Sequence, residues 1–376
     1  MGLFTPTMTI DLGITLENCI MMGNASGGPK SVMRNYSIDA ANKGHAVVVF
    51  RRAAGFSLCP GDLARSDMFS MSTKYGDAAQ KLDMFAGLSD EEKARKIIEI
   101  CRIYAPIDAM RLPMYEGYIR LMVSLLRLKG VNIKLDQLGD YDIDDIRDIN
   151  NNPRYVPNPT IKNRNNNLLN AITKEYMNLQ GIFSALSFGQ IAPMLSGTDS
   201  LEKVLDDYPV VEITLDVDNN PDESVILMDA IIDRLCSLNL GRMTKKQVYV
   251  VADQLPIDIM KKSTMNRLLT LKSYCHMLYA VTDISTLVEG DSDWHANCDT
   301  YMAFHQNSPK NMEYCSNMFG TKKRMQIDLF SSGRLGFNLR WVEEPIYRTN
   351  VFSGLPDNVC IYMTKKTGQH CRLTVC

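Results

Sequence analysis

No run of about 20 apolar residues, the length that an α-helix needs to span a bilayer, occurs in the sequence. No segment has the charged, apolar and small-residue parts of a secretory signal peptide. The ten cysteines are scattered and form no CxxC pair, which excludes a zinc site built from two such pairs. These absences predict a protein of the reducing cytoplasm without a membrane segment or anchor of its own.

Neither sign of charge dominates. The 41 basic and 43 acidic residues give a net charge of −2, which excludes a strongly basic nucleic-acid binder at the level of the whole chain; a local basic patch stays open. Apolar residues make up 45% and charged residues 22%, a balance that excludes disorder for the bulk of the chain. With 376 residues, the chain has room for two domains, or for one large α/β domain with an insertion.

The first 50 residues have the pattern of an α/β fold. An apolar strand pattern at 18–22 runs into the glycine-rich segment 23–31. A helix is expected to follow to about Asn42. The continuous apolar run 46–50 is typical of a strand that is buried on both faces. Strand, glycine loop, helix and buried strand together predict a βαβ unit.

Residues 83–180 change character and predict a helical insertion. One helix is expected at 113–129, between a proline and a glycine stop. The asparagine-rich stretches 150–153 and 163–167 are typical of loops, and a further helix is expected at about 166–180. After this region the α/β rhythm resumes. The expected strands are 210–215, 247–253, 277–283, 300–304 and, closing the fold, 359–363, and the expected helices are 221–240 and 309–319.

The glycine-rich segment has the context of a phosphate-binding P-loop. That motif reads GxxxxGK[ST] between a strand and a helix; its backbone N–H groups cradle phosphates, its Lys reaches them, and its hydroxyl binds Mg²⁺. Gly23 and Gly28 have the right separation, but Pro29 precedes Lys30 and Ser31. If the motif is aligned on Gly23 and Gly28, either one residue is inserted before Lys30, or Pro29 replaces the Lys. If it is aligned on Lys30 and Ser31 instead, Pro29 stands in place of the final Gly. Proline has no N–H and removes a donor from the cradle, so phosphate binding and a purely structural turn both stay open.

Acidic residues end two of the expected core strands. In P-loop ATPases such an Asp helps to hold Mg²⁺, often beside a Glu that activates the attacking water. Asp253 fits the metal role, and Gln254 can orient a water without accepting its proton; alternatively, Asp253 only caps the next turn. Asp283 ends the next strand, where related ATPases keep a polar sensor near the γ-phosphate. A carboxylate there repels phosphate unless a metal ion or a Lys offsets its charge.

Two short basic clusters are further candidates for binding phosphate or nucleic acid. Arg51 and Arg52 follow a buried strand at the edge where open α/β sheets bind ligands. They could contact phosphate or nucleic acid, but a solvated loop end is the favoured interpretation. Residues 322–324, Lys-Lys-Arg, follow a helix stop at Gly320, and so short a cluster is usually solvated surface.

The order of these segments resembles the cytoplasmic ATPase part of type IV secretion coupling proteins, the TraG/TraD-like conjugation ATPases, over about residues 12–370. The segments that carry the resemblance are 23–31, 85–92, 168–183, 210–240, 250–256, 279–287, 298–320 and 345–363. At the fifth of these, Val-Val-Ala-Asp-Gln-Leu-Pro, the family usually has Asp-Glu-Phe-Pro.

The resemblance implies a RecA-like P-loop NTPase core at 1–82 and 181–376 with an all-α insertion domain at 83–180. It implies a protein that couples ATP hydrolysis to moving or recruiting DNA or protein substrates at a secretion channel, as a homo-hexamer or a hetero-oligomer with channel components. The expected location is cytoplasmic, or peripheral at the inner membrane. The implied site is Gly23, Gly27, Gly28, Lys30 and Ser31 for ATP, Ser31 and Asp253 for Mg²⁺, Asp253 and Gln254 for catalysis, and Asp283 as sensor.

Four departures from the family pattern fall at the nucleotide site. Pro29 disturbs the loop, Arg51-Arg52 stands where an acidic-led motif is usual, Gln254 replaces a Glu, and Asp283 replaces a Gln. Two hypotheses follow: an ATPase motor with weakened hydrolysis, and a catalytically inactive pseudo-ATPase that acts as a structural or adaptor subunit. An unrelated α/β protein with a chance glycine loop is the third.

Overall fold

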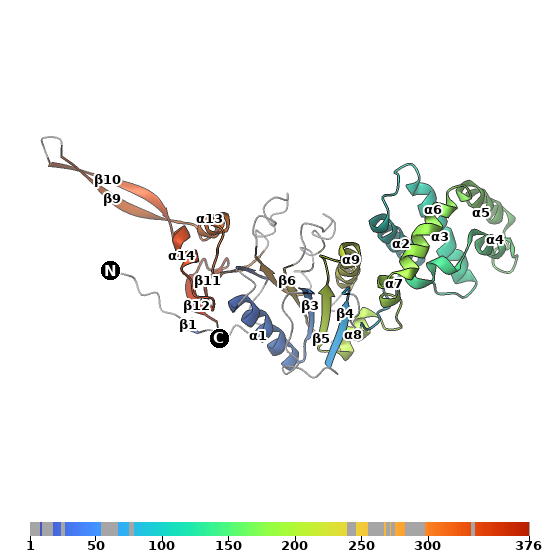
Figure 1. The fold of residues 1–376 in the computed structure, drawn as a ribbon, viewed down its shortest axis with the longest axis horizontal. Coiled ribbons are helices and arrows are strands. Elements are labelled where there is room, and N and C mark those ends of the chain that lie inside the picture. Colours follow the sequence, from blue (N-terminus) through green and yellow to red (C-terminus); the bar gives the residue numbers. More distant parts are fainter. Residues whose placement is uncertain are drawn as a thin grey trace. The chain divides into compact units, whose positions relative to one another are not determined.

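A computed structural model divides the chain into two compact units, which we call the sheet unit (Met1–Arg65 with Lys246–Cys376) and the helical unit (Ser66–Lys245). The structure describes residues 8–9, 18–23, 27–53, 67–74, 79–238, 246–254, 267, 271, 275–282, 298–331 and 335–375. Of residues 8–9, 326–331 and 335–340 it describes the backbone alone. Figure 1 shows the elements of both units.

The sheet unit is built on a mainly parallel sheet. Its strands lie in the order β1-β12-β11-β8-β2-β7-β6-β3, and neighbours from β8 to β3 run parallel. Their bounds are β1 (Met8–Thr9), β2 (Cys19–Met22), β3 (Ala46–Arg52), β6 (Val248–Asp253), β7 (His276–Val281), β8 (Thr300–Ala303), β11 (Val359–Thr364) and β12 (His370–Thr374). Residues 46–50 and 248–252 are almost fully buried, as expected for strands covered on both faces.

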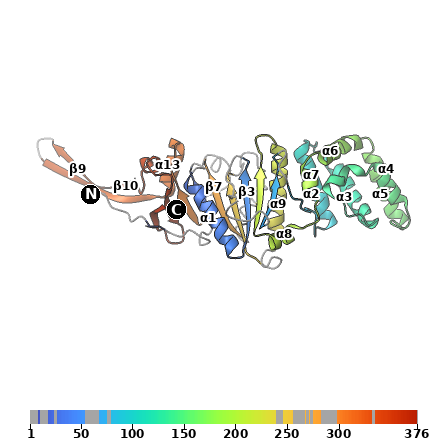
Figure 2. The same cartoon turned by 60° about the horizontal axis from the view of Figure 1, so that its bottom comes forward.

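Helix α1 (Gly28–Asn42) packs on β3 and β6, and both Figure 1 and Figure 2 show it lying against the sheet. The ring of Tyr36 on α1 meets the ring of Tyr249 on β6 edge-on, with 5.6 Å between the centroids. The other helices of this unit are α13 (Pro309–Met318) and α14 (Thr349–Ser353). Phe319 and Phe352 stack at 5.8 Å where these two helices pack.

The carboxyl-terminal part of the sheet unit differs from the sequence-based expectation. β11 was predicted to close the fold, but β12 follows it and pairs with it antiparallel. Residues 322–324 belong to β9 (Thr321–Ser331), which forms a hairpin with β10 (Leu335–Pro345). At the base of the hairpin the N–H of Ile346 donates to the carbonyl of Gly320 at 2.9 Å.

The helical unit packs a set of helices beside the parallel pair β4 (Met68–Ser72) and β5 (Val210–Leu215). The helices are α2 (Asp90–Tyr104), α3 (Leu112–Leu128), η2 (Leu135–Asp140), α4 (Ile143–Asn151), α5 (Pro159–Ile172), α6 (Tyr176–Phe188), α7 (Ile191–Met194), α8 (Leu201–Asp207) and α9 (Pro221–Ser237). Because this unit also holds β4, β5 and α9, its bounds differ from those of the expected insertion at 83–180, which stay a prediction. No described helix is long and apolar enough to cross a membrane.

The asparagine-rich stretch 163–167 is helical rather than a loop, whereas the stretch 150–153 is helical only up to Asn151 and leaves the helix at residues 152–153, as predicted. Asn150 lies in α4, and residues 163–167 lie inside α5. The side chain of Asn150 is fully buried, and its Nδ2 donates to the carbonyl of Lys162 at 3.1 Å and to Oδ1 of Asn166 at 2.9 Å. Because these amides bond between the two helices instead of to their own backbone, the usual preference of Asn for turns is overridden.

The single helix expected at 166–180 is likewise two helices. A turn at 173–175 separates α5 from α6, and the hydroxyl of Thr173 donates to the carbonyl of Leu169 at 2.7 Å. The N–H of Glu175 donates to the carbonyl of Ile172 at 2.8 Å. These bonds satisfy carbonyls that the end of a helix otherwise leaves without partners.

Gly197 lies where the helical unit has no room for a side chain. A Cβ at this position would lie 2.5 Å from the backbone carbonyl of Lys81. Because backbone atoms cannot swing away, we expect Gly197→Ala to lower the free energy of unfolding by about 1–3 kcal/mol. Gly181→Ala in α6 is the control: nothing lies within 4 Å of the added methyl group, so it should stabilise by about 0.5–1 kcal/mol. Equal urea midpoints for the two variants would contradict this packing.

Candidate nucleotide site

The glycine loop begins where the carboxyl ends of β2, β7 and β8 meet. The N–H of Gly23 donates to the carbonyl of Val281 on β7 at 3.0 Å, and the N–H of Phe304 donates to the carbonyl of Met22 on β2 at 2.8 Å. Gly23 has a φ of 151°, and a Cβ there would lie 2.8 Å from the Cβ of Phe304. Glycine is therefore required at this position by close approach as well as by conformation. Residues 24–26 lie outside the described residues.

The first turn of α1 offers few free N–H groups. Gly27 is the N-cap, with a φ of 72°, and Pro29 follows within the first two helical positions. The N–H of Gly28 donates to the carbonyl of Asp357 at 2.9 Å, and the N–H of Ser31 donates to the carbonyl of Gly27 at 3.1 Å. Because Pro29 has no N–H, the backbone N–H of Lys30 is the remaining candidate donor for an anion among residues 28–31.

Gly28 is also closed in by a side chain and by backbone. A Cβ there would lie 2.3 Å from Cε1 of Phe304 and 2.6 Å from the carbonyl oxygen of Asp357. A P-loop binds phosphate in the space at the N-terminus of the helix, where the helix dipole favours negative charge. Here a carbonyl oxygen of the chain itself lies at that end. Lys30 and Ser31, one step along the helix, are partly exposed and reachable from solvent.

Asp253 and Gln254 lie at the carboxyl end of β6. Asp253 is the last residue of the strand and is 1% exposed. Gln254 has a positive φ of 50°, and its N–H donates to the carbonyl of Ala280 on β7 at 2.9 Å. A non-glycine residue in the left-handed region is uncommon, and such strain gathers at functional sites. β7 lies between β2 and β6, so the glycine loop and Asp253 belong to the same edge of the sheet.

Arg51 and Arg52 are strand residues, which corrects their expected place after the strand. β3 extends to Arg52, and its pairing with β6 continues as far as Arg51, which lies opposite Asp253. Both arginines are partly exposed. A cationic residue beside the candidate magnesium ligand was not foreseen, since strand order cannot be deduced from the runs alone.

The described donors fit Mg²⁺ in chemical type. Magnesium takes hard oxygen ligands, and proteins commonly supply one or two carboxylates while phosphates and waters supply the rest. Asp253 provides a carboxylate and Ser31 a hydroxyl. Within the residues that the structure describes, no three His, Cys, Asp or Glu side chains gather as a metal cluster. Asp283, the expected sensor, lies outside the described residues.

Four residues near the glycine loop were missed by sequence reasoning: Phe304, Gln306, Asn311 and Asp357. Gln306 is 2% exposed, and its Nε2 donates to the carbonyls of Met22 at 2.8 Å and Phe304 at 3.2 Å. Asn311 donates to the carbonyl of Thr282 at 3.0 Å. Gln306 follows the end of a strand at the edge where α/β sheets bind ligands, and this position could have identified it as a candidate site residue. No comparable feature of the sequence points to Asp357.

Cys19 and Cys360 lie in the core of the sheet. Burial raises the pKa of the Cys19 thiol well above its ordinary value, and the neighbouring Cys298 and Cys360 raise it further. Burial also raises the pKa of Cys360. Because the thiolate is the nucleophile and metal ligand, these thiols do not serve chemistry at neutral pH.

No protein-family model and no curated protein sequence matches the chain. Solved structures do. The bacterial conjugative coupling protein TrwB, in its unbound form, matches with a TM-score of 0.62 at 14% identity over 95% of this chain and 84% of that one. TrwB in complex with ADP and Mg²⁺ matches with a TM-score of 0.61 at 13% identity over 95% and 84%. VirB4 of Thermoanaerobacter pseudethanolicus matches with a TM-score of 0.57 at 10% identity over 95% and 88%. The chain thus has the RecA-like α/β fold of TrwB and VirB4, as the sequence predicted.

Proposed function

We propose that the chain is a coupling-protein-like component of a conjugation or type IV secretion machine, which moves or recruits a DNA or protein substrate and whose ATP hydrolysis is weakened. The observation that carries the proposal is the strand, glycine loop and helix with Lys30 and Ser31 in the first helical turn, at the ligand-binding edge of a RecA-like sheet. A similar structure, TrwB, was solved with an ATP analogue and with ADP and Mg²⁺, which supports the same ligands here.

In this proposal each residue has a separate task. Lys30 contacts the phosphates, with the backbone at Gly23, Gly27 and Gly28 shaping the loop around them. Ser31 and Asp253 hold Mg²⁺, which when bound neutralises developing charge on the phosphates. Gln254 orients a water, and Asp283 occupies the sensor position.

Hydrolysis should be slow for two reasons. Gln254 has no basic oxygen to take the proton of the attacking water, so the general-base contribution of about 10²–10⁴-fold is missing. The cradle is also reduced, since Gly28 already donates to Asp357 and Pro29 cannot donate. The second of these observations favours the alternative of a pseudo-ATPase that keeps the fold as a structural or adaptor subunit.

The proposed setting follows from the same resemblance. The chain would act in a homo-hexamer, or in a hetero-oligomer with secretion-channel components, with DNA as a candidate substrate. Its proposed location is cytoplasmic or peripheral at the inner membrane.

Calorimetric titration of MgATP tests the proposal on the wild type, on Lys30→Ala and on Lys43→Ala. Lys43 follows the opposite end of α1 and pairs with Asp39 at 2.8 Å, so it is a matched control. We expect weak wild-type binding that falls at least tenfold in Lys30→Ala, because a charge-assisted bond contributes about 1.5–3 kcal/mol, and that persists in Lys43→Ala. No binding by the wild type would favour the pseudo-ATPase, and turnover at about 1–100 s⁻¹, as in ordinary phosphoryl-transfer enzymes, would contradict weakened hydrolysis.

A further inference from the structure

The hairpin of β9 and β10 is a long element that lacks a covering layer among the described residues. The two strands pair over eleven positions, from Thr321 opposite Pro345 to Ser331 opposite Leu335, and they pair only with each other. Figure 1 shows them as an extended two-stranded ribbon. An isolated two-stranded hairpin is marginally stable in water, because stable sheets need a hydrophobic face packed on something.

The pairing register of β9 and β10 determines which residues share each face of the hairpin. Successive residues of a strand alternate between faces, and directly opposite residues share one. One set of alternate positions is occupied by apolar residues in three successive cross-strand pairs. We call this set the apolar face: Met325 opposite Trp341, Ile327 opposite Leu339, and Leu329 opposite Phe337.

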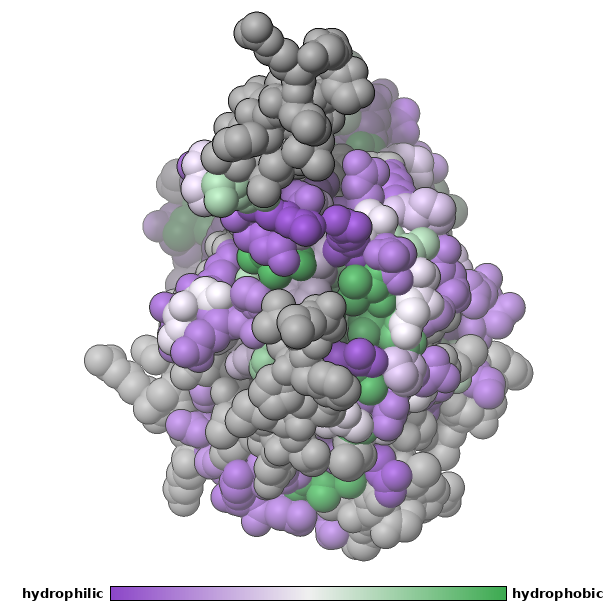
Figure 3. Space-filling view, turned by 90° about the vertical axis from the view of Figure 1, so that its left-hand side faces the viewer, coloured by the Kyte–Doolittle hydropathy of each residue, from purple (hydrophilic) through white to green (hydrophobic). Residues whose placement is uncertain are grey.

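The described part of the apolar face is open to solvent. Met325 is 50% exposed and Trp341 is 69% exposed. Among the described residues of the sheet unit, these are the large apolar residues exposed by half or more. Figure 3 views the molecule from the side that is on the left in Figure 1, and its described surface is mostly hydrophilic with small hydrophobic patches. An exposed Trp–Met pair at the start of an apolar row marks an interaction surface.

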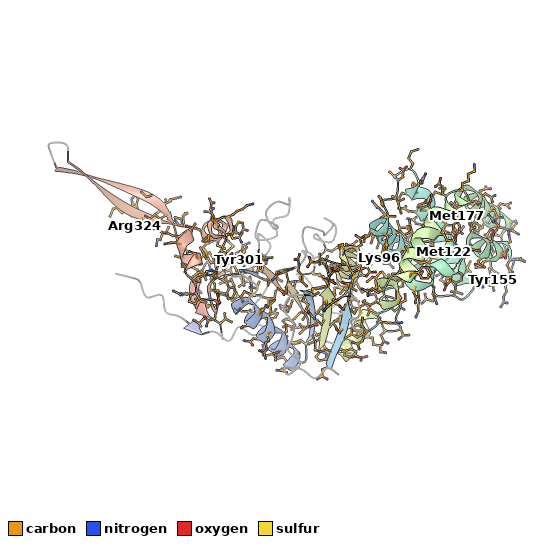
Figure 4. All side chains as sticks on the ribbon, viewed as in Figure 1. Lys96, Met122, Tyr155, Met177, Tyr301 and Arg324 are labelled. Atoms are coloured by element: carbon orange, nitrogen blue, oxygen red, sulfur yellow. The ribbon has the colours of Figure 1, made fainter. Side chains whose placement is uncertain are left out.

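The described part of the opposite face holds Lys322, Arg324, Val342 and Glu344, and its charges of opposite sign lie close together. Lys322 lies opposite Glu344 in the register. Arg324, labelled in Figure 4, has its Nη1 3.5 Å from Oε2 of Glu344, and Arg348 approaches the same oxygen at 3.6 Å. Charged groups of this kind can stay hydrated, so the row of apolar residues on the apolar face is the surface that a partner would cover.

The chemistry of the apolar face fits a protein surface better than a lipid surface. Trp, Phe, Met and Arg are enriched in the cores of protein interfaces, whereas membrane-surface segments carry a strongly basic face. Residues 321–345 hold five basic and three acidic residues, which is a mixed charge. The same face on a second copy is a suitable partner, because an apolar face is its own complement and symmetric contacts use one patch twice.

The surface area that two apolar faces would bury is consistent with a second copy of the chain as the partner. An aromatic ring buries about 150–250 Å², and an aliphatic side chain about 60–120 Å² at the usual energy per area. Two apolar faces packed on each other therefore bury about 1,100–2,000 Å² in total, close to the range of about 1,200–2,000 Å² found for stable specific interfaces. We propose that the hairpin is a self-association arm, whose apolar face packs on the apolar face of a second copy of the chain as a two-layer β-sandwich.

Sedimentation velocity over micromolar concentrations tests the proposal with the double variant Met325→Thr/Trp341→Thr. Threonine keeps the strand preference and removes the apolar surface. We expect the mass of the assembled wild type to fall by half in this variant, with at least a tenfold weaker association. Val342→Thr, the neighbouring position on the other face, is the control and should assemble like the wild type. No residue of the nucleotide site takes part, so MgATP binding should be the same in all three proteins.

Tryptophan emission identifies the occupant of the apolar face. The chain has two tryptophans, Trp294 and Trp341, so Trp294→Phe leaves Trp341 as the reporter. We expect a blue shift that follows the rise in mass with concentration. A blue-shifted emission at monomer mass would mean that the hairpin folds back on its own chain. A shift that needs phosphatidylcholine–phosphatidylglycerol vesicles would mean that lipid covers it; either result overturns the proposal.

Discussion

Deleting Pro29 is expected to raise the affinity for MgATP at least tenfold. The deletion brings residues 23–28 directly before Lys30 and Ser31 and produces Gly-Asn-Ala-Ser-Gly-Gly-Lys-Ser, which matches the P-loop spacing GxxxxGK[ST]. The residue that then follows Gly28 carries an N–H, and the lysine moves into the position that reaches the phosphates. One charge-assisted hydrogen bond contributes about 1.5–3 kcal/mol, and 1.4 kcal/mol is about a factor of ten in affinity.

Pro29→Ala separates the two parts of this effect. It restores the N–H and keeps the inserted residue, so the lysine stays one position late. We expect calorimetry to show a gain of a few fold at most, because Gly28 still donates to the carbonyl of Asp357. Circular dichroism and a thermal transition like that of the wild type establish that both variants are folded. A folded deletion variant with wild-type affinity would mean that the loop is a structural turn, as in the pseudo-ATPase hypothesis.

The central strands could be predicted because their own residues determine them. Residues 46–50 and 248–252 are continuous apolar runs, and both are buried strands in the sheet unit. The order of the strands is not contained in those runs. It places β7 between β2 and β6 and sets Arg51 opposite Asp253.

Two kinds of structural feature were not predicted from the sequence. The hairpin was hidden because Lys322, Lys323 and Arg324 were interpreted as a surface cluster, although apolar residues alternate with polar ones directly after them. The second kind depends on partners far away in the chain. Asp357 closes the first turn of α1 from more than 300 residues away, and no local pattern announces such a contact.

Lys96→Met is expected to lower the free energy of unfolding of the helical unit by about 3–5 kcal/mol. Lys96 on α2 is 5% exposed (Figure 4). Its Nζ lies 2.7 Å from Oδ2 of Asp233 and 3.9 Å from Oδ2 of Asp229, both on α9, and 3.0 Å from Oε2 of Glu99. Methionine preserves most of the packing but removes the ammonium, so the carboxylates of α9 keep their charge in a poorly solvated place without their cation.

Arg127→Met is the matched control, because it removes a cation from the same unit at the surface. Arg127 is 68% exposed and pairs with Asp90 at 2.8 Å, and exposed pairs contribute about 0–1 kcal/mol. Hydrogen exchange of peptides from α2 and α9 measures the helical unit separately from the sheet unit. We expect faster exchange in Lys96→Met and unchanged exchange in Arg127→Met.

If Lys96 stabilises the unit through its charge, a second substitution should partly restore stability, which is not expected if Lys96 acts through packing. If the loss in Lys96→Met comes from stranded carboxylates, then removing a carboxylate as well should restore part of the stability, since replacing a whole buried ion pair is often neutral. We therefore expect Lys96→Met/Asp233→Asn to exchange more slowly than Lys96→Met. A double variant less stable than Lys96→Met would show that Lys96 acts through packing of its aliphatic stem instead.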